Sequence, residues 1–209
     1  REITSIQELK DIQPIGEHHP WIEQQIKVVK EIRSHFHEEI ASFYNIFSPI
    51  SYLKRWFRTD QSRGDQVISD FIKEDPEALA HVLDVIAEDI ATLSCRLIQE
   101  AGVEGIYFST QQVQDERVSQ EEYRKFIEPS SIVVLESANE AGGINILHIC
   151  GFEGAINEVK LFKDYPAQVI NWATHHEGLS LAEGRKLFGN RAVLGGFVNG
   201  KKGLLYKGE

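Results

Sequence analysis

The chain has 209 residues, 42% of them hydrophobic, with a formal net charge of −10. This length and apolar content suit a globular domain, whereas the acidic balance excludes a general nucleic-acid or anionic-membrane binder, because phosphate-rich partners require a basic surface. No apolar run approaches the ~18 residues that a membrane-spanning helix requires, and the charged start of the chain is not a secretory signal.

Five short segments are predicted to be buried strands. Each is rich in β-branched or aromatic residues and apolar on both faces, which is typical of a parallel sheet covered by helices. In chain order they are residues 40–49, 103–110, 144–150, 167–173 and 191–197. The first is predicted to end at Ser48-Pro49, because proline cannot donate a hydrogen bond to a strand ladder.

Helical patterns separate these strands. Residues 20–37 carry apolar side chains at helical spacing, which are Trp21, Ile22, Ile26, Val29, Ile32 and Phe36. Asp75-Pro76 is a typical N-cap and first helical residue, and Gly102 is predicted to end the long helix that follows.

Two further helices are predicted in the second half of the chain. One spans Ser119–Phe126, and Pro129 is expected to mark the boundary beyond it. The other opens with a capping box of Ser180 and Glu183 and ends at Gly189.

Strands alternating with helices through short connections indicate an α/β protein. A doubly wound sheet would usually carry a glycine-rich phosphate-binding motif after its first strand, and this sequence has none. A (β/α)8 TIM barrel fits better, although it needs eight strands and five are legible. We therefore expect residues 1–209 to form a single barrel domain that is incomplete, with parts missing at the N- and C-terminal ends.

A histidine and a cysteine lie together at the end of the third strand. His148 and Cys150 are two residues apart in INILHICG, so both side chains project from one face of the strand. In a barrel, catalytic groups lie at the carboxyl ends of the strands, and imidazole with thiolate is a natural pair of zinc ligands. Two interpretations stay open: a zinc site, or a hydrogen-bonded histidine beside a cysteine that packs in the core.

Other residues near strand ends are candidate substrate ligands: Tyr107, Thr110, Gln111, Asn171, Trp172 and Asn199. Thr110 and Gln111 have the chemistry to bind a carboxylate, amide or carbonyl group, although a solvated loop explains them equally well. A tryptophan such as Trp172 can cover a flat ligand or pack in the core.

The remaining histidines and the second cysteine are predicted to have no part in the chemistry. Histidines 18 and 19, histidines 35 and 37, and the cluster 175–177 are expected on the surface. Cys95 lies within a long helical pattern and is expected to fill the core. Two cysteines cannot form a disulfide scaffold, which favours a reducing cytoplasmic setting.

Six motifs follow one another along roughly residues 65 to 200: DPEALAHVLDVIAEDI, AGVEGIYFSTQ, VSQEEYRKFIEP, INILHICG, VINW and AVLGGF. In this order they resemble the uroporphyrinogen decarboxylase superfamily. The resemblance implies a single (β/α)8 barrel and one of two activities. These are decarboxylation of porphyrinogens in haem synthesis, which needs no cofactor, and zinc-dependent methyl transfer between corrinoid proteins and thiols.

The methyltransferase branch carries an HxCG motif that supplies two zinc ligands, which the resemblance places at His148, Cys150 and Gly151. The third zinc ligand in that branch is a cysteine near the C-terminus, which would lie beyond Glu209.

The decarboxylase pattern matches less well. In the decarboxylases, an N-terminal segment with two arginines binds the substrate carboxylates. We expect that segment to lie upstream of this chain. The usual Asp-Ser pair of the decarboxylases is replaced by Thr110 and Gln111, and their aspartate after VLGG by Val198.

We therefore expect a zinc-dependent methyltransferase that acts between a corrinoid or other methyl donor and a thiol. The alternatives are uroporphyrinogen decarboxylase, a carboxy-lyase of porphyrin biosynthesis, and a non-catalytic barrel that binds a corrinoid or a partner protein. The expected partners are a small thiol or tetrapyrrole, a corrinoid protein and a second copy in a homodimer, with no nucleic acid and no membrane.

Overall fold

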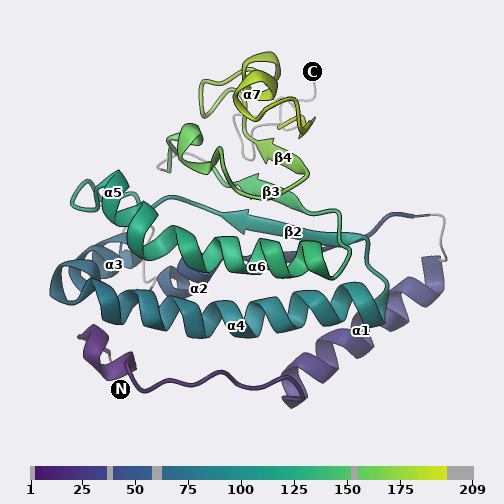
Figure 1. The fold of residues 1–209 in the computed structure, drawn as a ribbon, viewed down its shortest axis with the longest axis horizontal. Coiled ribbons are helices and arrows are strands. Elements are labelled where there is room, and N and C mark those ends of the chain that lie inside the picture. The colour runs from purple at the N-terminus through teal and green to yellow at the C-terminus, as the bar shows by residue number, and fades with distance from the viewer. Residues whose placement is uncertain (1–2, 37–39, 58–62, 152–154, 197–209) are drawn as a thin grey trace.

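The computed structural model describes residues 3–36, 40–57, 63–151 and 155–196 (Figure 1). Its core is a five-stranded parallel sheet with strand order β1-β2-β3-β4-β5. The strands are β1 (Phe43–Phe47), β2 (Gly105–Thr110), β3 (Ile146–Ile149), β4 (Val169–Trp172) and β5 (Ala192–Leu194). The five predicted strands are thus confirmed, each shorter than its apolar segment. This arrangement is the α/β fold of an incomplete TIM barrel.

The helices lie between and before the strands. Their bounds are η1 (Ile6–Leu9), α1 (Pro20–Phe36), α2 (Pro49–Trp56), α3 (Arg63–Glu74), α4 (Pro76–Ala101), α5 (Gln120–Glu122), the π-helix η3 (Tyr123–Ile127), α6 (Glu128–Glu140), η4 (Val159–Phe162) and α7 (Leu181–Leu187). None of the described helices is both long and apolar enough to cross a bilayer.

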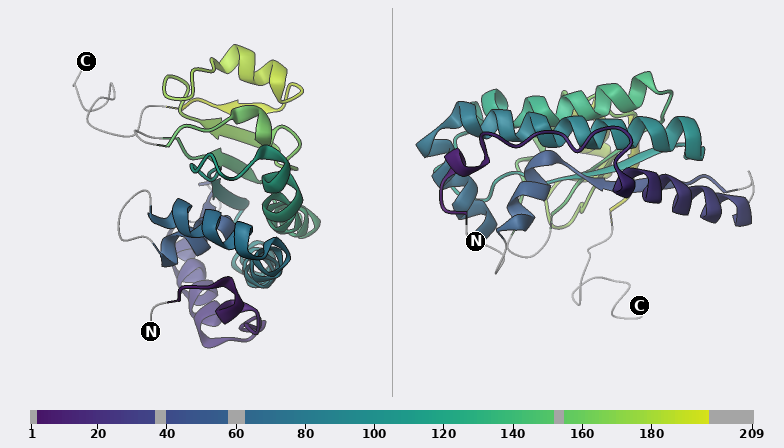
Figure 2. Two further views of the ribbon diagram at one scale, coloured as in Figure 1. Left: turned by 90° about the vertical axis from the view of Figure 1, so that its left-hand side faces the viewer. Right: turned by 90° about the horizontal axis from the view of Figure 1, so that it is seen from below.

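Helices cover one face of the sheet, and α4 and α6 run side by side along it (Figures 1 and 2). Side chains alternate along a strand, so every second residue points to this covered face. The residues that it buries are Ile46, Ile106, Phe108, Leu147, Ile149, Ile170 and Trp172. The hydrophobic core of the described residues therefore lies between the sheet and the helical layer.

The opposite face of the sheet, here called the open face, corresponds to the face that lines the interior of a complete barrel. In-register pairing arranges its side chains in rows. One row, here called the His148 row, contains Phe47, Ser109, His148, Asn171 and Leu194. The neighbouring row contains Asn45, Tyr107, Ile146, Val169 and Ala192. Polar and aromatic residues from four strands thus share one surface.

The prediction that every strand is covered on both faces is wrong for the two edge strands. Phe43 of β1 and Leu194 of β5 are 37% and 46% exposed. Among the described residues no helix packs against the open face at these positions, so their apolar character was not a sign of burial.

The termini of the long helix α4 follow the prediction. The Asp75 side chain accepts a hydrogen bond from the backbone N–H of Ala78 at 3.0 Å, which caps the first turn. Gly102 ends the helix with a φ of 72°, a left-handed conformation that glycine adopts without strain.

Helix α1 covers less apolar surface than its sequence pattern predicted. Ile22, Ile26 and Val29 are buried, but Trp21, Ile32 and Phe36 are 43%, 53% and 55% exposed. Of these six side chains, only Ile22, Ile26 and Val29 therefore belong to the hydrophobic core of the described residues.

Pro129 lies at an element boundary, as predicted, but this boundary does not interrupt the helical course of the chain. Ser119 caps α5 as expected, and the chain continues through the π-helix η3 directly into α6, whose first turn contains Pro129. Proline is tolerated in a first turn because its missing N–H would have no intrahelical partner there. Ser180 and Glu183 form the predicted capping box of α7.

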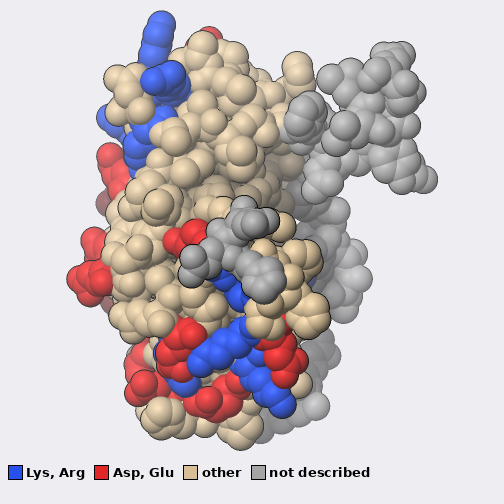
Figure 3. All heavy atoms as spheres, turned by 90° about the vertical axis from the view of Figure 1, so that its right-hand side faces the viewer, with Lys and Arg blue, Asp and Glu red and all other residues tan. Residues whose placement is uncertain are grey.

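Ion pairs connect α1 to α4 and to the loop before β2. Arg96 Nη1 lies 2.6 Å from Glu23 Oε1, and Arg33 Nη1 lies 3.2 Å from Glu104 Oε1. Glu104 also accepts a hydrogen bond from the backbone N–H of Ser42 at 2.5 Å. Figure 3 shows basic and acidic side chains intermixed over the lower part of one side of the molecule, as paired charges require.

Helix α7 packs so closely on β4 that position 184 tolerates no side chain. A methyl group on Gly184 would overlap the indole of Trp172. We expect Gly184→Ala to lower the free energy of unfolding by about 1–3 kcal/mol through this overlap, measured by urea denaturation. Alanine has a higher helix propensity than glycine, so without the overlap this substitution would stabilise the protein. An increase in stability would therefore contradict the close packing of Gly184 on Trp172. Trp172→Phe in the same chain should relieve part of the loss.

Candidate functional site

His148 occupies the centre of the open face. Its ring stacks on the ring of Tyr107, with centroids 5.1 Å apart and an interplanar angle of 30°. Its Nδ1 lies 2.5 Å from Oδ1 of Asn171, on the neighbouring strand β4. The Tyr107 hydroxyl donates a hydrogen bond of 2.8 Å to the same oxygen. The three side chains therefore form one hydrogen-bonded unit across β2, β3 and β4.

The hydrogen bonds of Asn171 determine which nitrogen of His148 carries the proton. Asn171 Nδ2 donates to the carbonyl of Leu194 at 3.0 Å, so its Oδ1 is the atom that faces Tyr107 and His148. An amide oxygen only accepts hydrogen bonds, and Nδ1 of His148 must therefore be the donor. Burial lowers the pKa of His148, which keeps the ring neutral at pH 7. The lone pair consequently lies on Nε2, which hydrogen-bonds none of the described residues.

Cys150 directly follows β3, and its backbone is held on both sides. Its N–H donates to the Thr110 carbonyl at 2.8 Å. Its carbonyl accepts hydrogen bonds from Gln111 Nε2 at 3.0 Å and from Asn157 Nδ2 at 3.2 Å. The backbone of Cys150, and with it the Cβ that carries the thiol, is therefore fixed.

The charge state of Cys150 is set by opposing effects. Burial raises the pKa of the thiol, and the nearby carboxylate of Glu177 raises it further, whereas Arg55 and a hydrogen bond with Ser109 lower it. In the absence of a bound cation these effects leave the group a thiol at neutral pH.

Glu177 is held over the start of the loop that follows Cys150. Its two carboxylate oxygens accept hydrogen bonds of 2.7 Å each from the backbone and side-chain N–H groups of Asn157. A Cβ at Gly151 would overlap this carboxylate, so the glycine permits the contact. Residues 175–177 lie in a turn, as expected; His175 is exposed, whereas His176 and Glu177 are partly buried.

A buried ion pair supports the same region. Lys54 and Asp65 are 8% and 5% exposed, and Nζ lies 2.6 Å from Oδ1. Lys54 Nζ also donates to Gln111 Oε1 at 3.0 Å and to the Gln112 carbonyl at 3.3 Å. Both ends of the Gln111 amide are therefore used inside the protein, between Lys54 and Cys150. Gln111, predicted to bind substrate, is placed as a support for Cys150.

The predicted substrate ligands divide between the two faces of the sheet. Tyr107 and Asn171 lie beside His148 on the open face. Thr110 and Trp172 are 1% and 0% exposed and lie on the covered face, and Asn199 lies outside the described residues. The expectation that Thr110 and Trp172 face a ligand is wrong.

Strand register explains both corrections. Thr110 pairs with Ile149, and Ile149 pairs with Trp172, so all three point toward the helices. The Thr110 hydroxyl donates to Ser48 Oγ at 3.0 Å. The Trp172 indole N–H donates to the Leu179 carbonyl at 2.8 Å beneath α7.

Two contributors, Arg55 and Asn157, were missed by the sequence reasoning, and Glu177 was assigned to a surface loop. Asn157 and Glu177 lie on loops with no periodic pattern, and nothing in the sequence indicated that they would meet.

The described residues offer two donor groups of the kind that zinc prefers, whereas a catalytic zinc takes three protein ligands. His148 offers an unprotonated Nε2 and Cys150 a sulfur from the same strand end, which is the donor chemistry that zinc prefers. Within the described ranges no group of three or more His, Cys, Asp or Glu residues is placed to hold a metal. Cys95 does not contribute, since it lies in α4 and donates to the Ser137 carbonyl at 3.3 Å. A third ligand would therefore come from outside these residues.

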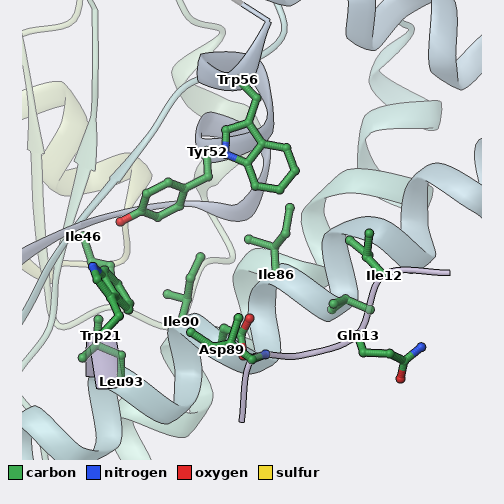
Figure 4. Close-up of a pocket in the computed structure, with 12 residues that line it drawn as sticks. Ile12, Gln13, Trp21, Ile46, Tyr52, Trp56, Ile86, Asp89, Ile90 and Leu93 are labelled. Atoms are coloured by element: carbon green, nitrogen blue, oxygen red, sulfur yellow. The ribbon is translucent and has the colours of Figure 1, made fainter. Parts of the chain in front are cut away.

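An apolar cavity of about 370 Å³ lies elsewhere in the molecule (Figure 4). It lies on the helix side of β1, between the N-terminal arm, α2 and α4, and Trp21, Tyr52 and Trp56 are among its walls. Asp89 in its lining accepts a hydrogen bond from the backbone N–H of Ile15 at 2.9 Å. None of the residues around His148 and Cys150 lines this cavity.

Comparisons with known proteins agree with the fold. The family model described as Uroporphyrinogen decarboxylase (URO-D) matches residues 1–208. Among solved structures, a methyltransferase from Methanosarcina mazei is similar with a TM-score of 0.61 and 19% sequence identity, over 82% of this chain and 47% of that chain. The chain thus spans about half the length of that methyltransferase. A search of curated protein sequences found no match.

The Lys54–Asp65 pair provides a test of the support beneath Cys150. Lys54→Met leaves the buried Asp65 carboxylate without its cation, and we expect the free energy of unfolding to fall by about 3–5 kcal/mol. The double variant Lys54→Met/Asp65→Leu removes both charges and should recover much of the loss. Urea denaturation of the three proteins measures this, and an unchanged midpoint for Lys54→Met alone would contradict the pairing.

Proposed function

Since the chain belongs to the uroporphyrinogen decarboxylase family, we propose that it is part of a zinc-dependent methyltransferase that transfers a methyl group from a corrinoid or other donor to a thiol. The observation that carries the proposal is the unprotonated Nε2 of His148, with Cys150 two residues further along at the same strand end. The fold of a methyltransferase from Methanosarcina mazei adds support, at 19% identity.

His148 and Cys150 would be two of the zinc ligands, and a residue outside the described ranges would be the third. Zinc lowers the pKa of a bound thiol, which makes the substrate a thiolate at neutral pH. In the net reaction the substrate sulfur gains a methyl group, the donor loses it, and the proton of the thiol passes to solvent.

The other residues of the site hold these two groups in place. Asn171 and Tyr107 fix the orientation and tautomer of His148, as second ligand shells do in metal sites. Gln111 and Asn157 fix the carbonyl of Cys150. The polar row of the open face is where a small thiol would reach both ligands.

Decarboxylation of uroporphyrinogen is a second candidate, because the family model that matches the chain carries that name. It requires no metal, and it would use the open face to hold a tetrapyrrole. Conversion of uroporphyrinogen to coproporphyrinogen by the full-length protein separates the two activities. Methyl transfer to any thiol would in turn rule out a non-catalytic barrel.

The partners that we propose are a corrinoid protein and a second copy of the chain, and the location that we propose is the cytoplasm.

Zinc content is the direct test of the ligand pair. We expect the full-length protein to bind zinc, and His148→Ala and Cys150→Ala each to lose most of it, because each removes one ligand. Elemental analysis after dialysis measures the zinc per chain. Cys95→Ala is the matched control and should keep its zinc. A metal-free wild-type protein would contradict the proposal.

The hydrogen bond from Asn171 should affect zinc binding without touching the metal. Asn171→Leu removes the acceptor that fixes the tautomer of His148, and we expect zinc affinity to fall about 10–100-fold. Competition with a chromogenic chelator measures the affinity. Thr110→Val, a change on the covered face of the neighbouring strand, should leave it unaltered. Equal losses in both variants would indicate a general effect on folding.

A further inference from the structure

The apolar cavity on the helix side of β1 has the size of a small-molecule site. Its volume is about 370 Å³, and pockets for small ligands have volumes of about 300–1,000 Å³. Its walls come from the N-terminal arm, α1, α2 and α4, and Ile46 of β1 contributes a fully buried side chain (Figure 4). Well-packed protein interiors hold few voids larger than a water molecule, so a space of this volume is more than a packing defect.

The N-terminal arm, which connects η1 to α1, forms one wall of the cavity and is anchored at both ends. Near its start, Gln7 Nε2 donates to Asp75 Oδ2 at 2.7 Å. Near its end, the backbone N–H of Ile15 donates to Asp89 Oδ1 at 2.9 Å. These bonds hold Ile12 and Ile15 against the cavity. The wall is therefore preformed, as in most small-molecule sites.

Three aromatic side chains border the same space. Trp21 belongs to α1, and Tyr52 and Trp56 belong to α2 (Figure 4). Trp21 and Trp56 are 43% and 57% exposed, so much of their surface stays available. Large exposed aromatic residues at a concave apolar surface mark binding sites. The faces of their rings are electronegative, and they attract organic cations in particular.

Asp89 of α4 is the only charged side chain among the described residues that line the cavity. No described basic side chain lies within ion-pair distance of it. Burial raises the pKa of Asp89, whereas backbone hydrogen bonds from Ile15 and Gly16 lower it. A carboxylate has about four lone-pair sites, so these two donors leave it capacity for a cation.

We propose that this cavity binds an organic ammonium ion, whose apolar body packs against the aliphatic and aromatic walls while its ammonium group pairs with Asp89. A neutral apolar ligand would remove water from the carboxylate without replacing its interactions, which costs free energy. A hard metal ion needs several oxygen ligands, and the described walls offer one carboxylate. An ammonium ion, in contrast, interacts favourably with both the carboxylate and the rings.

Two small molecules of equal size test the proposal on the full-length protein. 2-Phenylethylammonium and 2-phenylethanol have the same number of heavy atoms and differ in charge. We expect the ammonium ion to bind roughly tenfold more tightly than the alcohol at low ionic strength. Isothermal titration calorimetry measures both affinities. Equal affinities, or no binding of either compound, would overturn the proposal.

A substitution at Asp89 locates the charge that is responsible. Asp89→Asn removes the charge but keeps a side-chain oxygen for the N–H of Ile15, so the arm keeps its anchor. We expect this variant to lose most of the preference for the ammonium ion and to bind the alcohol as wild type does. Asp84→Asn is the matched control, because Asp84 lies on the same helix outside the lining of the cavity. An unchanged preference in Asp89→Asn, or an equal loss in Asp84→Asn, would contradict the site.

A larger side chain inside the cavity should exclude both compounds. Ile86 lines the cavity (Figure 4), and Ile86→Phe fills part of its volume. We expect the affinities of this variant for the ammonium ion and for the alcohol to fall together. Val133→Phe, an equally bulky change at an exposed position of α6, should alter neither. Wild-type binding of both compounds by Ile86→Phe would overturn the location of the site.

Discussion

The parallel, in-register pairing of the five strands is the constraint on which the site depends. Because side chains alternate along each strand, register alone decides which residues share a face. It brings Phe47, Ser109, His148 and Asn171, which come from four separate segments, into one row. A shift of β3 by one residue would turn His148 and Cys150 toward the helices and Ile149 toward the open face.

The register is in turn held by the buried side of the sheet. The covered face packs large apolar side chains, among them Phe108, Leu147 and Trp172, against the helical layer. Exposing them by a slip would cost several times the energy of any single hydrogen bond on the open face. The polar groups of the site therefore need not stabilise the fold, and their arrangement can serve ligand binding.

The sequence predicted the features that local chemistry determines. Strand segments, the cap at Asp75, the glycine stop at Gly102 and the shared face of His148 and Cys150 all follow from periodicity and from backbone preferences. The faces of Thr110 and Trp172 were not predicted, because a strand buried on one side and aromatic on the other shows no alternation of polarity. Asn157 and Glu177 could not be predicted, since they meet through loops whose course depends on the whole fold.

The different environments of Lys54 and Arg55 follow from the point at which β1 ends. Ser48 and Pro49 stop the strand and start α2 at once, so the direction of this short helix is fixed by the sheet. Successive residues on a helix point about 100° apart. Lys54 therefore turns into the core, where Asp65 and Gln111 accept its hydrogen bonds, and Arg55 turns back over Phe47. A buried lysine without partners would be too costly to keep, so Lys54 is held by Asp65 and Gln111, whereas Arg55 stays exposed on the Phe47 ring.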